Sequence, residues 1–274
     1  MSLFMVDSEK CNRDGICVET CPAQIINRNG SNGLPVPAVD ADENCINCGH
    51  CVAVCPTGAI SLFKMNPEEC SPVQQDLLPT PEQVEHFFRT RRSIRTYTEN
   101  KVDRQILTKL IRLAAYAPSG HNTQPVRWKI IYDTGEVRRL AGLVVDWMRH
   151  VIEEQPDMAA SMHLERVVAS WEDGNERICR GAPHVIIAHA PKNLRPAMAA
   201  CTIALAHLEL AASAFGLGVC WAGYFNAASN LWPPMTAALK LPEGHASFGA
   251  MMIGYPKYKY HRIPLRNEPK ISWC

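Results

Sequence analysis

The sequence contains four closely spaced cysteines, Cys45, Cys48, Cys51 and Cys55, in a C-x2-C-x2-C-x3-C run that Pro56 closes. Three thiolates at this spacing can hold one iron–sulfur cubane along a tight loop, while the fourth reaches across to a second cluster. A zinc knuckle or a set of buried cysteines is the alternative, but zinc sites usually place two C-x2-C pairs far apart. The run therefore predicts iron–sulfur chemistry and electron transfer.

A partial copy of this run precedes it, with Asp14 at the position where the second cysteine is expected. Because the last cysteine of each run binds the other cluster, we expect two crossed groups of ligands. The first group is Cys21, Cys45, Cys48 and Cys51, and the second is Cys11, Asp14, Cys17 and Cys55. The first group should hold an ordinary [4Fe–4S] cluster.

Asp14 leaves three outcomes open for the second group. The site can hold a [3Fe–4S] cluster, a [4Fe–4S] cluster with Asp14 as an oxygen ligand, or a cluster completed by another thiol such as Cys70. A carboxylate suits iron less well than a thiolate in this setting, so the iron at Asp14 should be labile. Of the three outcomes we favour the four-iron cluster with a labile corner.

The cysteine-rich part of the chain resembles the two-cluster ferredoxins of bacteria. Residues 17–26 are similar to residues 51–60, which implies two pseudo-symmetric cluster loops, each leading into a short helix and a strand. The Gly-, Asn- and Pro-containing stretch 27–37 predicts a hairpin between the two halves. We expect a small ferredoxin-like α+β domain over residues 1–66 and a Pro-rich, polar linker over residues 67–81.

Length and composition predict a second, larger domain over residues 82–274. The chain has 274 residues, of which 47% are hydrophobic, so it can bury a sizeable core. A net charge of +1 argues against a partner such as nucleic acid or an anionic membrane. Twelve cysteines would suit a secreted scaffold, but the N-terminal residues have no apolar signal core and seven cysteines have cluster spacing. We therefore expect a cytoplasmic protein.

Hydrophobic periodicity predicts alternating helices and strands in this larger domain, and thus an α+β or α/β fold with a central sheet. The helices are expected over residues 82–89, 103–116, 137–153 and 197–215, and the strands over residues 128–132, 184–190, 219–222 and 248–253. Asp103 is expected to cap its helix, whose apolar face should comprise Ile106, Leu110, Ile111 and Leu113. Gly216 and Gly218 should supply positive φ angles after the last helix. That apolar helix carries His207 and Glu209, so we predict no membrane span.

Four short segments of the larger domain follow one another in an order that is typical of one protein family. They are residues 91–95 (RRSIR), 117–125 (APSGHNTQP), 216–223 (GLGVCWAG) and 253–256 (IGYP). Together they resemble the FMN-dependent nitroreductase family, from about residue 82 to the C-terminus, and the cysteine-rich part in front resembles its ferredoxin-fused branch. The resemblance implies an α+β fold in which a central mixed sheet is flanked by helices.

The resemblance also implies a set of FMN-binding residues. Guanidinium groups and a hydroxyl suit a dianionic phosphate, and side-chain amides suit the pyrimidine edge of a flavin. The residues implied are Arg91, Arg92, Ser93, Arg262 and Lys259 for the phosphate and ribityl chain, Asn122 and Gln124 for the pyrimidine edge, and Trp221, Ala222 and Gly223 beside the ring. Main-chain amides of that last segment would stabilise the reduced flavin. Trp221 suits the core as well as it suits the ring.

In this family, residues that match Pro118, Ser119 and Asn122 come from the neighbouring subunit, which implies a homodimer with two shared sites. The alternative to a role at the flavin is that these residues only form a capped turn between a helix and a strand. His121 is a weak candidate for a proton donor, since a structural hydrogen bond explains it equally well. Cys220 is expected to be a small buried apolar residue. No residue is assigned a catalytic role, because the flavin would do the chemistry.

These expectations describe an enzyme that passes electrons from iron–sulfur clusters to FMN and on to a small acceptor such as a nitroaromatic or a quinone. The donor would be an external ferredoxin or a nicotinamide, although no G-x-G-x-x-G segment predicts a separate dinucleotide domain. The alternatives are an electron relay to a protein partner and a redox or iron sensor built on the Asp14 cluster. The sequence does not identify the electron acceptor, because residues 146–180 contain no recognisable motif.

Overall fold

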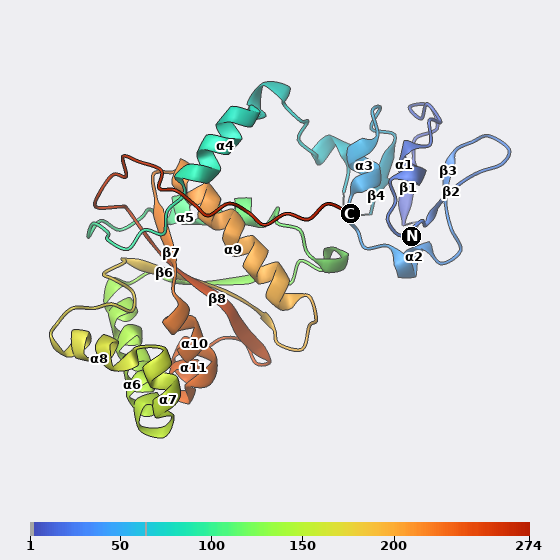
Figure 1. Ribbon diagram of the computed structural model, residues 1–274. Helices are drawn as coiled ribbons and strands as arrows, with labels where there is room; N and C mark the ends of the chain where they lie inside the picture. The colour runs from blue at the N-terminus through green and yellow to red at the C-terminus, as the bar shows by residue number, and fades with distance from the viewer. Residues whose placement is uncertain (1–2, 64) are drawn as a thin grey trace. The chain divides into compact units, whose positions relative to one another are not determined.

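A computed structural model describes residues 3–63 and 65–274 of the chain, which form two compact units. Unit 1 comprises residues 1–79 with residues 121–123, and unit 2 comprises residues 80–120 with residues 124–274. Three positions of the first predicted domain, Met1, Ser2 and Lys64, lie outside the described residues. Figure 1 shows the elements of both units.

Unit 1 is built from two short antiparallel strand pairs and three short helices. The strands are β1 (Phe4–Val6) paired with β4 (Ile60–Leu62) and β2 (Ile26–Arg28) paired with β3 (Pro35–Pro37), and the helices are α1 (Ile16–Glu19), α2 (Ala41–Asn44) and α3 (His50–Val54). The β2–β3 hairpin confirms the prediction for residues 27–37.

The internal repeat is confirmed by matching turns before α1 and α3. Gly15 precedes α1 with a φ of 78°, and Gly49 precedes α3 with a φ of 75°. Glycine tolerates this left-handed backbone without the steric cost that a Cβ atom would bring. Each helix then leads into a strand, β2 after α1 and β4 after α3. The two halves of unit 1 thus present their cysteines from equivalent loops.

The segment between the cysteine-rich part and unit 2 is exposed and contains two 3-10 turns, Pro67–Glu69 and Gln75–Leu77. Helix α4 (Pro81–Thr90) follows it and begins with a capping box, in which the side chains of Thr80 and Gln83 each accept a hydrogen bond from the other's main-chain N–H. No residue of α4 is buried, and Val84 and Phe88 on it are exposed.

Unit 2 contains a four-stranded sheet in the order β5-β6-β8-β7, whose neighbouring strands all pair antiparallel. An isolated parallel bridge joins Ser93 to Val219 at the β7 edge. The strands are β5 (Arg127–Ile131), β6 (His184–Pro191), β7 (Gly218–Trp221) and β8 (His245–Gly254). The helices after α4 are α5 (Arg104–Ala114), α6 (Thr134–Glu154), α7 (Pro156–Ser161), α8 (Leu164–Glu172), α9 (Ala197–Ala214), α10 (Gly223–Leu231) and α11 (Pro233–Leu239), and Gly120–Asn122 forms a 3-10 turn.

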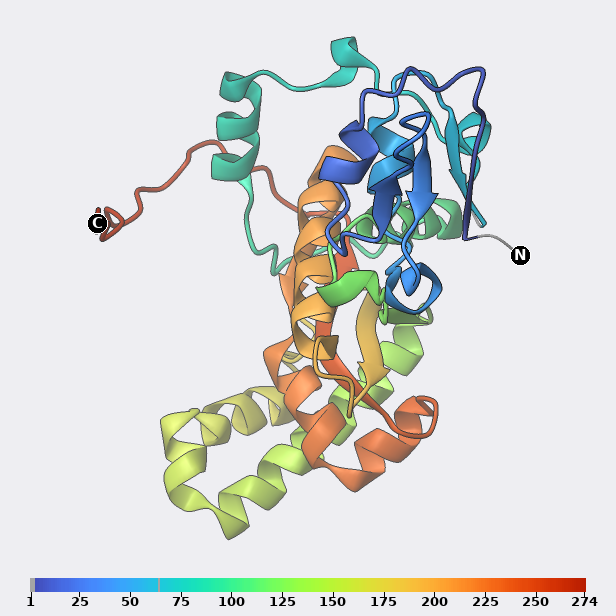
Figure 2. The same cartoon turned by 90° about the vertical axis from the view of Figure 1, so that its right-hand side faces the viewer.

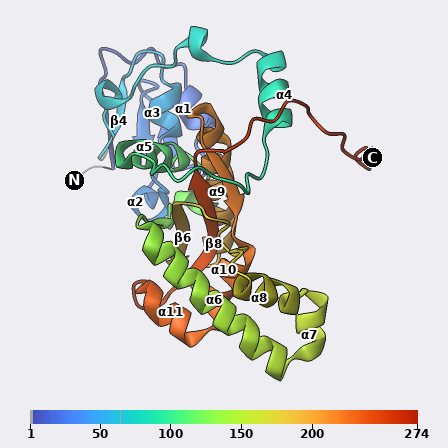
Figure 3. The same ribbon diagram turned by 90° about the vertical axis from the view of Figure 1, so that its left-hand side faces the viewer.

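Helices cover both faces of this sheet, so its central strands are apolar on both sides. Along β6, Val185 and Ile187 pack on the side of α6 and α10, whereas Ile186 and Ala188 pack on the side of α5 and α9. A strand buried on both faces reads as a continuous apolar run, which is why residues 184–190 could be recognised. Figure 3 shows α6 and α9 on opposite sides of β6 and β8.

Helix α9 packs against the sheet and against α5, and Figure 2 shows it in orange in front of the strands. Within the described residues it is the one helix long and apolar enough to cross a membrane by length and composition. Eight of its side chains, including that of Glu209, are buried inside the protein. We therefore interpret α9 as a core helix, in line with the sequence prediction.

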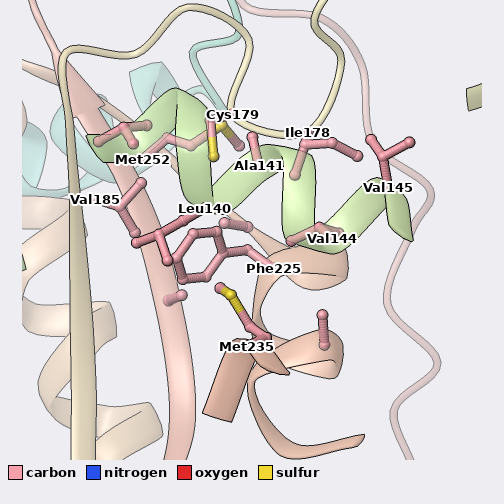
Figure 4. Packing of buried hydrophobic residues seen from close by; sticks show 14 of the residues in the cluster. Leu140, Ala141, Val144, Val145, Ile178, Cys179, Val185, Phe225, Met235 and Met252 are labelled. Atoms are coloured by element: carbon pink, nitrogen blue, oxygen red, sulfur yellow. The ribbon is translucent and has the colours of Figure 1, made fainter. Parts of the chain in front are cut away.

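The opposite layer is packed around Phe225 of α10, which is fully buried. Figure 4 shows its ring between Leu140 of α6 and Met235 of α11. The same cluster includes Ile178 and Cys179, which precede β6 and lie next to Ala141 of α6. These contacts anchor the loop that leads from α8 into the sheet.

Two local predictions are wrong in detail. Asp103 does cap α5, accepting a hydrogen bond from the N–H of Gln105 at 2.6 Å. Ile106, Leu110 and Ile111 pack against the core as predicted, but Leu113 is exposed, and the buried positions also include Leu107 and Ala114. Positions three and four apart share a helix face, so an error of one residue in phase selects the wrong leucine.

After α9, Gly216 has the expected positive φ of 68°, but Gly218 does not. Gly218 lies in β7, where a Cβ atom would come within 2.5 Å of Ile94. This glycine therefore serves close packing of residues 93–94 against the strand, and only Gly216 serves the turn.

Two buried histidines in the sheet are held neutral. Nδ1 of His184 hydrogen-bonds to the Tyr132 carbonyl at 2.7 Å and Nε2 accepts from the N–H of Val102 at 2.9 Å, which requires a proton on Nδ1 alone. Burial lowers the pKa of His184. Burial, with the nearby charge of His245, lowers the pKa of His189 to about 4.

Acidification should therefore destabilise the fold. The ordinary pKa of a histidine is 6.5. Between pH 6.5 and about 4, His189 therefore binds a proton in the unfolded state but not in the folded state. Above pH 6.5 the contribution of His189 to the free energy of unfolding is fully present. As the pH drops below 6.5, the free energy of unfolding should decrease by up to about 1.4 kcal/mol per pH unit for this group. Thermal unfolding followed by circular dichroism measures the slope. The variant His189→Gln should make stability less dependent on pH, whereas His86→Gln, at an exposed position of α4, should not. If both variants had the same slope, His189 would not be the group responsible.

Candidate functional site

The first group of cysteines lines one cavity in unit 1. Cys21 of the first run lies there together with Cys45, Cys48 and Cys51 of the second, and Phe4, Ile25, Ile26 and Leu62 supply apolar walls. Burial raises the pKa of Cys51 to about 11, and the charges of Cys48 and Cys21 contribute to the shift. The main-chain N–H of Asn47 donates to Sγ of Cys45 at 3.4 Å. Four sulfurs in an apolar cavity are the donor set that a cubane requires.

The second group is also brought together. Burial raises the pKa of Cys17, and the charges of Cys11, Cys55 and Asp14 raise it further, so Cys17 lies within electrostatic range of the other three side chains. Burial also acts to raise the pKa of Cys55, but hydrogen bonds from the Thr57 hydroxyl and from main-chain N–H groups outweigh it and leave this pKa lowered. Both groups thus combine residues of the two runs in the crossed arrangement.

Asp14 faces its own main chain as well as the second group. Its Oδ1 accepts a hydrogen bond from the N–H of Ile16 at 3.0 Å, at the start of α1, and its carbonyl accepts one from Arg28 at 2.8 Å. One oxygen of the carboxylate is therefore bound at the turn that begins α1. Within the described parts of the chain, no three His, Cys, Asp or Glu side chains converge closely enough to hold a single metal ion.

In unit 2, the residues expected at a phosphate meet in one cavity beside β7. Arg91 and Arg92 line it, as do Lys259 and the chain from Gly216 to Val219. Among the described residues, neither Arg92 nor Lys259 has a carboxylate within ion-pair distance. Ser93 lies at the adjoining bridge to Val219, whereas Arg262 lies on the exposed C-terminal segment and does not line this cavity.

Arg91 is engaged in a partly buried network that the sequence did not reveal. Its Nη1 lies 2.7 Å from Oε1 of Glu209 on α9, and the other carboxylate oxygen of Glu209 accepts from Nε1 of Trp221 at 3.2 Å. Glu209 thus joins the arginine cluster to the end of β7. Trp221 itself is 38% exposed, so its indole is not a core residue.

The segment expected beside the flavin ring lines a second cavity of unit 2. Trp221, Ala222 and Gly223 form part of its wall, and a Cβ atom added at Gly223 would meet nothing within 4 Å. Helix α10 begins at Gly223, so its first main-chain N–H groups have no partner within the helix. Open space beside unpaired N–H groups suits a flat ring that carries hydrogen-bond acceptors.

The remaining predicted residues lie elsewhere. Pro118, Ser119 and Gln124 line a third cavity of unit 2, where Oγ of Ser119 accepts from the N–H of Gln124 at 2.9 Å. His121 and Asn122 have positive φ angles and group with unit 1. The roles of these five residues at a flavin stay predictions. Cys220 is buried, as expected.

Sequence reasoning missed Glu209, Arg177 and Arg180. Glu209 is the charged residue of an otherwise apolar helix, and a buried carboxylate needs a cation, so this signal was present. Arg177 and Arg180 line the same cavity as Gly223, but they lie in the motif-free stretch 146–180.

Comparison with protein families identifies both parts of the chain. The model described as "Nitroreductase family" matches residues 88–255, and the model described as "4Fe-4S dicluster domain" matches residues 9–59. An NADH dehydrogenase of Thermus thermophilus is 31% identical over 198 residues, which cover 67% of this chain and 92% of that protein. A ferredoxin named "Ferredoxin 7Fe" from Hydrogenibacillus schlegelii is 41% identical over 66 residues, which cover 23% of this chain and 78% of that protein.

Among solved structures, a nitroreductase of Desulfitobacterium hafniense DCB-2 with bound FMN superposes with a TM-score of 0.56. It is 19% identical and covers 69% of this chain and 97% of that chain. At this identity the likeness concerns the fold, and it agrees with the α+β arrangement of unit 2.

Proposed function

The chain belongs to the nitroreductase family of oxidoreductases, with a 4Fe-4S dicluster domain in front, and from this premise we propose that it is an iron–sulfur flavoprotein. It would pass electrons from its clusters to FMN and on to a small acceptor such as a nitroaromatic or a quinone. The observation that carries the proposal is the presence, in one chain, of two crossed cysteine groups and a nitroreductase unit with a cationic cavity beside β7. Residues 1–66 would be the iron–sulfur domain, 67–81 the linker and 82–274 the FMN domain.

The residues of unit 2 suit FMN by their chemistry. Arg92 and Lys259 would hold the phosphate, with Arg91 kept in place by Glu209 and Ser93 beside them. The N–H groups at the start of α10 would donate to the ring beside Gly223. When bound, FMN supplies the conversion of single electrons into a two-electron reduction of the acceptor.

The apolar wall of the ring cavity would exclude water from the acceptor. Met162, Ile178, Cys220 and Met252 contribute this wall. Placing the acceptor against the ring would contribute most of the rate, because an oriented pair of reactants avoids the entropic cost of a bimolecular encounter.

For the clusters, we propose a [4Fe–4S] cluster at Cys21, Cys45, Cys48 and Cys51 and a [3Fe–4S] cluster at Cys11, Cys17 and Cys55. The bond between Asp14 and the N–H of Ile16 favours the three-iron cluster over the Asp-ligated cluster favoured on sequence alone. The name of the Hydrogenibacillus schlegelii ferredoxin, with its seven irons, agrees with one cluster of each kind.

Asp14→Cys should convert the second site to a stable four-iron cluster. A thiolate at this position can bind the iron that the carboxylate leaves out, so the iron content should rise by about one atom per chain. The signal of an oxidised [3Fe–4S] cluster in electron paramagnetic resonance should disappear, while the FMN content stays the same. Asp14→Asn serves as the control and should keep the signal. An unchanged spectrum and iron content in Asp14→Cys would show that position 14 does not face the cluster.

A homodimer and a cytoplasmic location are parts of this proposal. The C-terminal segment after Gly254 is extended and exposes Tyr258, Tyr260, Leu265 and Trp273, which are large apolar side chains that a second copy of the chain could cover. The predicted flavin residues also fall into three separate cavities of one chain, as expected for a site completed by a neighbour.

The proposed function is tested by turnover. Anaerobically purified protein should contain FMN and two clusters, and should reduce a nitroaromatic or quinone acceptor when supplied with reduced ferredoxin or with NADH. NADH is included because the Thermus thermophilus relative is named an NADH dehydrogenase. Protein that holds all cofactors but reduces no acceptor with either donor would contradict the proposal.

A further inference from the structure

The cavity beside Gly223, in which the flavin ring is proposed to lie, also has a cationic lining that has been given no role at FMN. Its volume is about 470 Å³, and its lining contains Arg95, Arg177 and Arg180. No Asp or Glu lies among its lining residues in the described parts of the chain. None of the three arginines pairs with a carboxylate of a described residue. Cations without carboxylate partners around a cavity of ligand size indicate a site for an anion.

The loop that carries two of these arginines is held rigidly. Both carboxylate oxygens of Glu176 are bound to the main chain, accepting from the N–H of Cys179 at 2.6 Å and of Gly181 at 2.8 Å. Ile178 and Cys179 are buried in the cluster of Figure 4. Because Glu176 is turned to the main chain, it is not free to pair with either arginine. Arg177 and Arg180 thus stand on a fixed backbone.

Arg180 also has an unfavourable backbone conformation. Its φ is 58°, in the left-handed region that side chains other than Gly, Asn and Asp rarely adopt. Such strain persists where the surrounding structure enforces it, and it is found most often at functional sites. Here the hydrogen bonds of Glu176 enforce it, and the result is that the side chain of Arg180 lines the cavity.

The third arginine approaches from the segment before α5. Arg95 and Arg180 both line the cavity, and their charges act to lower the pKa of the Tyr97 phenol, which burial raises. The Tyr97 hydroxyl donates to the carbonyl of Ile94 at 2.6 Å, which fixes the ring. Arg95 and Arg180 therefore converge on the cavity from two different segments.

We propose that the part of this cavity not filled by the flavin binds an acceptor that carries a carboxylate group, with Arg177 and Arg180 on the carboxylate and the reducible end facing the ring that residues 221–223 would hold. The inference rests on the proposed function and names its substrate class, a nitroaromatic or quinonoid acid. Met162, Cys220 and Met252 supply the apolar surface for the ring of such an acid. Reduction of a nitro acid to the nitroso acid consumes two electrons and two protons and releases one water; the cofactor, when bound, would supply the electrons, and solvent water would supply the protons.

The test compares an acid with its neutral isostere. 4-Nitrobenzoate and 4-nitrobenzamide differ mainly in charge, so the ratio of their KM values measures recognition of the carboxylate. Binding of the unreactive pair benzoate and benzamide to the oxidised holoprotein, followed by calorimetry, gives the same ratio without turnover. Because hydrogen bonds to charged groups are stronger than neutral ones, we expect a preference of about 10- to 100-fold for the acid. Added salt should weaken it.

The variants Arg177→Gln and Arg180→Gln should each reduce this preference about 10-fold, and the double variant should abolish it. Arg180→Lys should restore part of it, because the charge returns without the bidentate geometry. Arg138→Gln, at an exposed arginine of α6, is the matched control and should keep the preference. FMN content is measured for every variant and should not change.

Two results would overturn the inference. An equal affinity for benzoate and benzamide would mean that the arginines do not recognise an anion. Loss of FMN in the variants at Arg177 and Arg180 would mean that they hold the phosphate of the cofactor instead of the acceptor. Failure of the proposed function looks different, because binding of benzoate would then persist in a protein that reduces neither nitro compound.

Discussion

Replacing Cys51 by alanine should remove the [4Fe–4S] cluster and prevent an external one-electron donor from reducing FMN. Cys51 is buried and lines the same cavity as Cys21, Cys45 and Cys48, and alanine has no group that could bind iron in place of the sulfur. With three thiolates left, the site loses one iron if a [3Fe–4S] cluster remains and four if the whole cluster is lost, so the iron content should fall by about one to four atoms per chain. Iron analysis and the visible absorption of the clusters measure this loss.

Cys70→Ala provides the control, because this cysteine is exposed and its Sγ donates to the carbonyl of Asn66 outside both groups. It should keep the full iron content, and FMN content should be the same in both variants. If Cys51→Ala kept all its iron, or if Cys70→Ala lost an equal amount, the assignment of the first group would be wrong.

Replacing Arg91 by methionine should destabilise unit 2, because it leaves the carboxylate of Glu209 without its cation. The two side chains are 28% and 10% exposed, so water screens this pair in part. A fully buried pair would cost about 3–5 kcal/mol when one partner is removed, and here we expect about 2 kcal/mol of the free energy of unfolding. Chemical denaturation followed by fluorescence measures it.

Two further variants separate the structural effect from a direct role at FMN. Glu209→Gln removes the buried charge and keeps an acceptor for Nε1 of Trp221, so combining it with Arg91→Met should recover most of the lost stability. Arg92→Met should leave stability unchanged and weaken FMN binding about 10-fold or more, because a charge-assisted bond to the phosphate is lost. Additive losses in the double variant, or full FMN affinity in Arg92→Met, would contradict this division of roles.

The parts of the chain that sequence predicted best are those whose determinants are local. Spacing within two short cysteine runs was enough to predict that Cys21 lies near Cys45, Cys48 and Cys51, and the repeated glycines before α1 and α3 explain why the loops match. The helix cap at Asp103 and the buried strand β6, with its continuous apolar run, were also predicted from the sequence. In each case a few neighbouring residues determine the conformation.

The parts that escaped prediction depend on contacts between distant residues. Glu209 meets Arg91 across 118 positions, and only the fold brings them together. The positive φ of Arg180 results from a carboxylate on its own loop, which no propensity scale anticipates. The hydrogen bond from the N–H of Ile16 to Oδ1 of Asp14 is local, but neither residue forms a motif that predicts it from the sequence. Long-range charge pairing is therefore the main gap between sequence and site.

The central claim, that the cysteine groups deliver electrons to FMN, is tested most directly by stopped flow. Anaerobic protein is mixed with reduced ferredoxin, and separately with reduced nicotinamides, while bleaching of FMN is followed. The account predicts rapid bleaching by ferredoxin that disappears in Cys51→Ala. Rapid bleaching by a nicotinamide, with none by ferredoxin in the unmodified protein, would contradict it, because FMN would then take its electrons without the clusters.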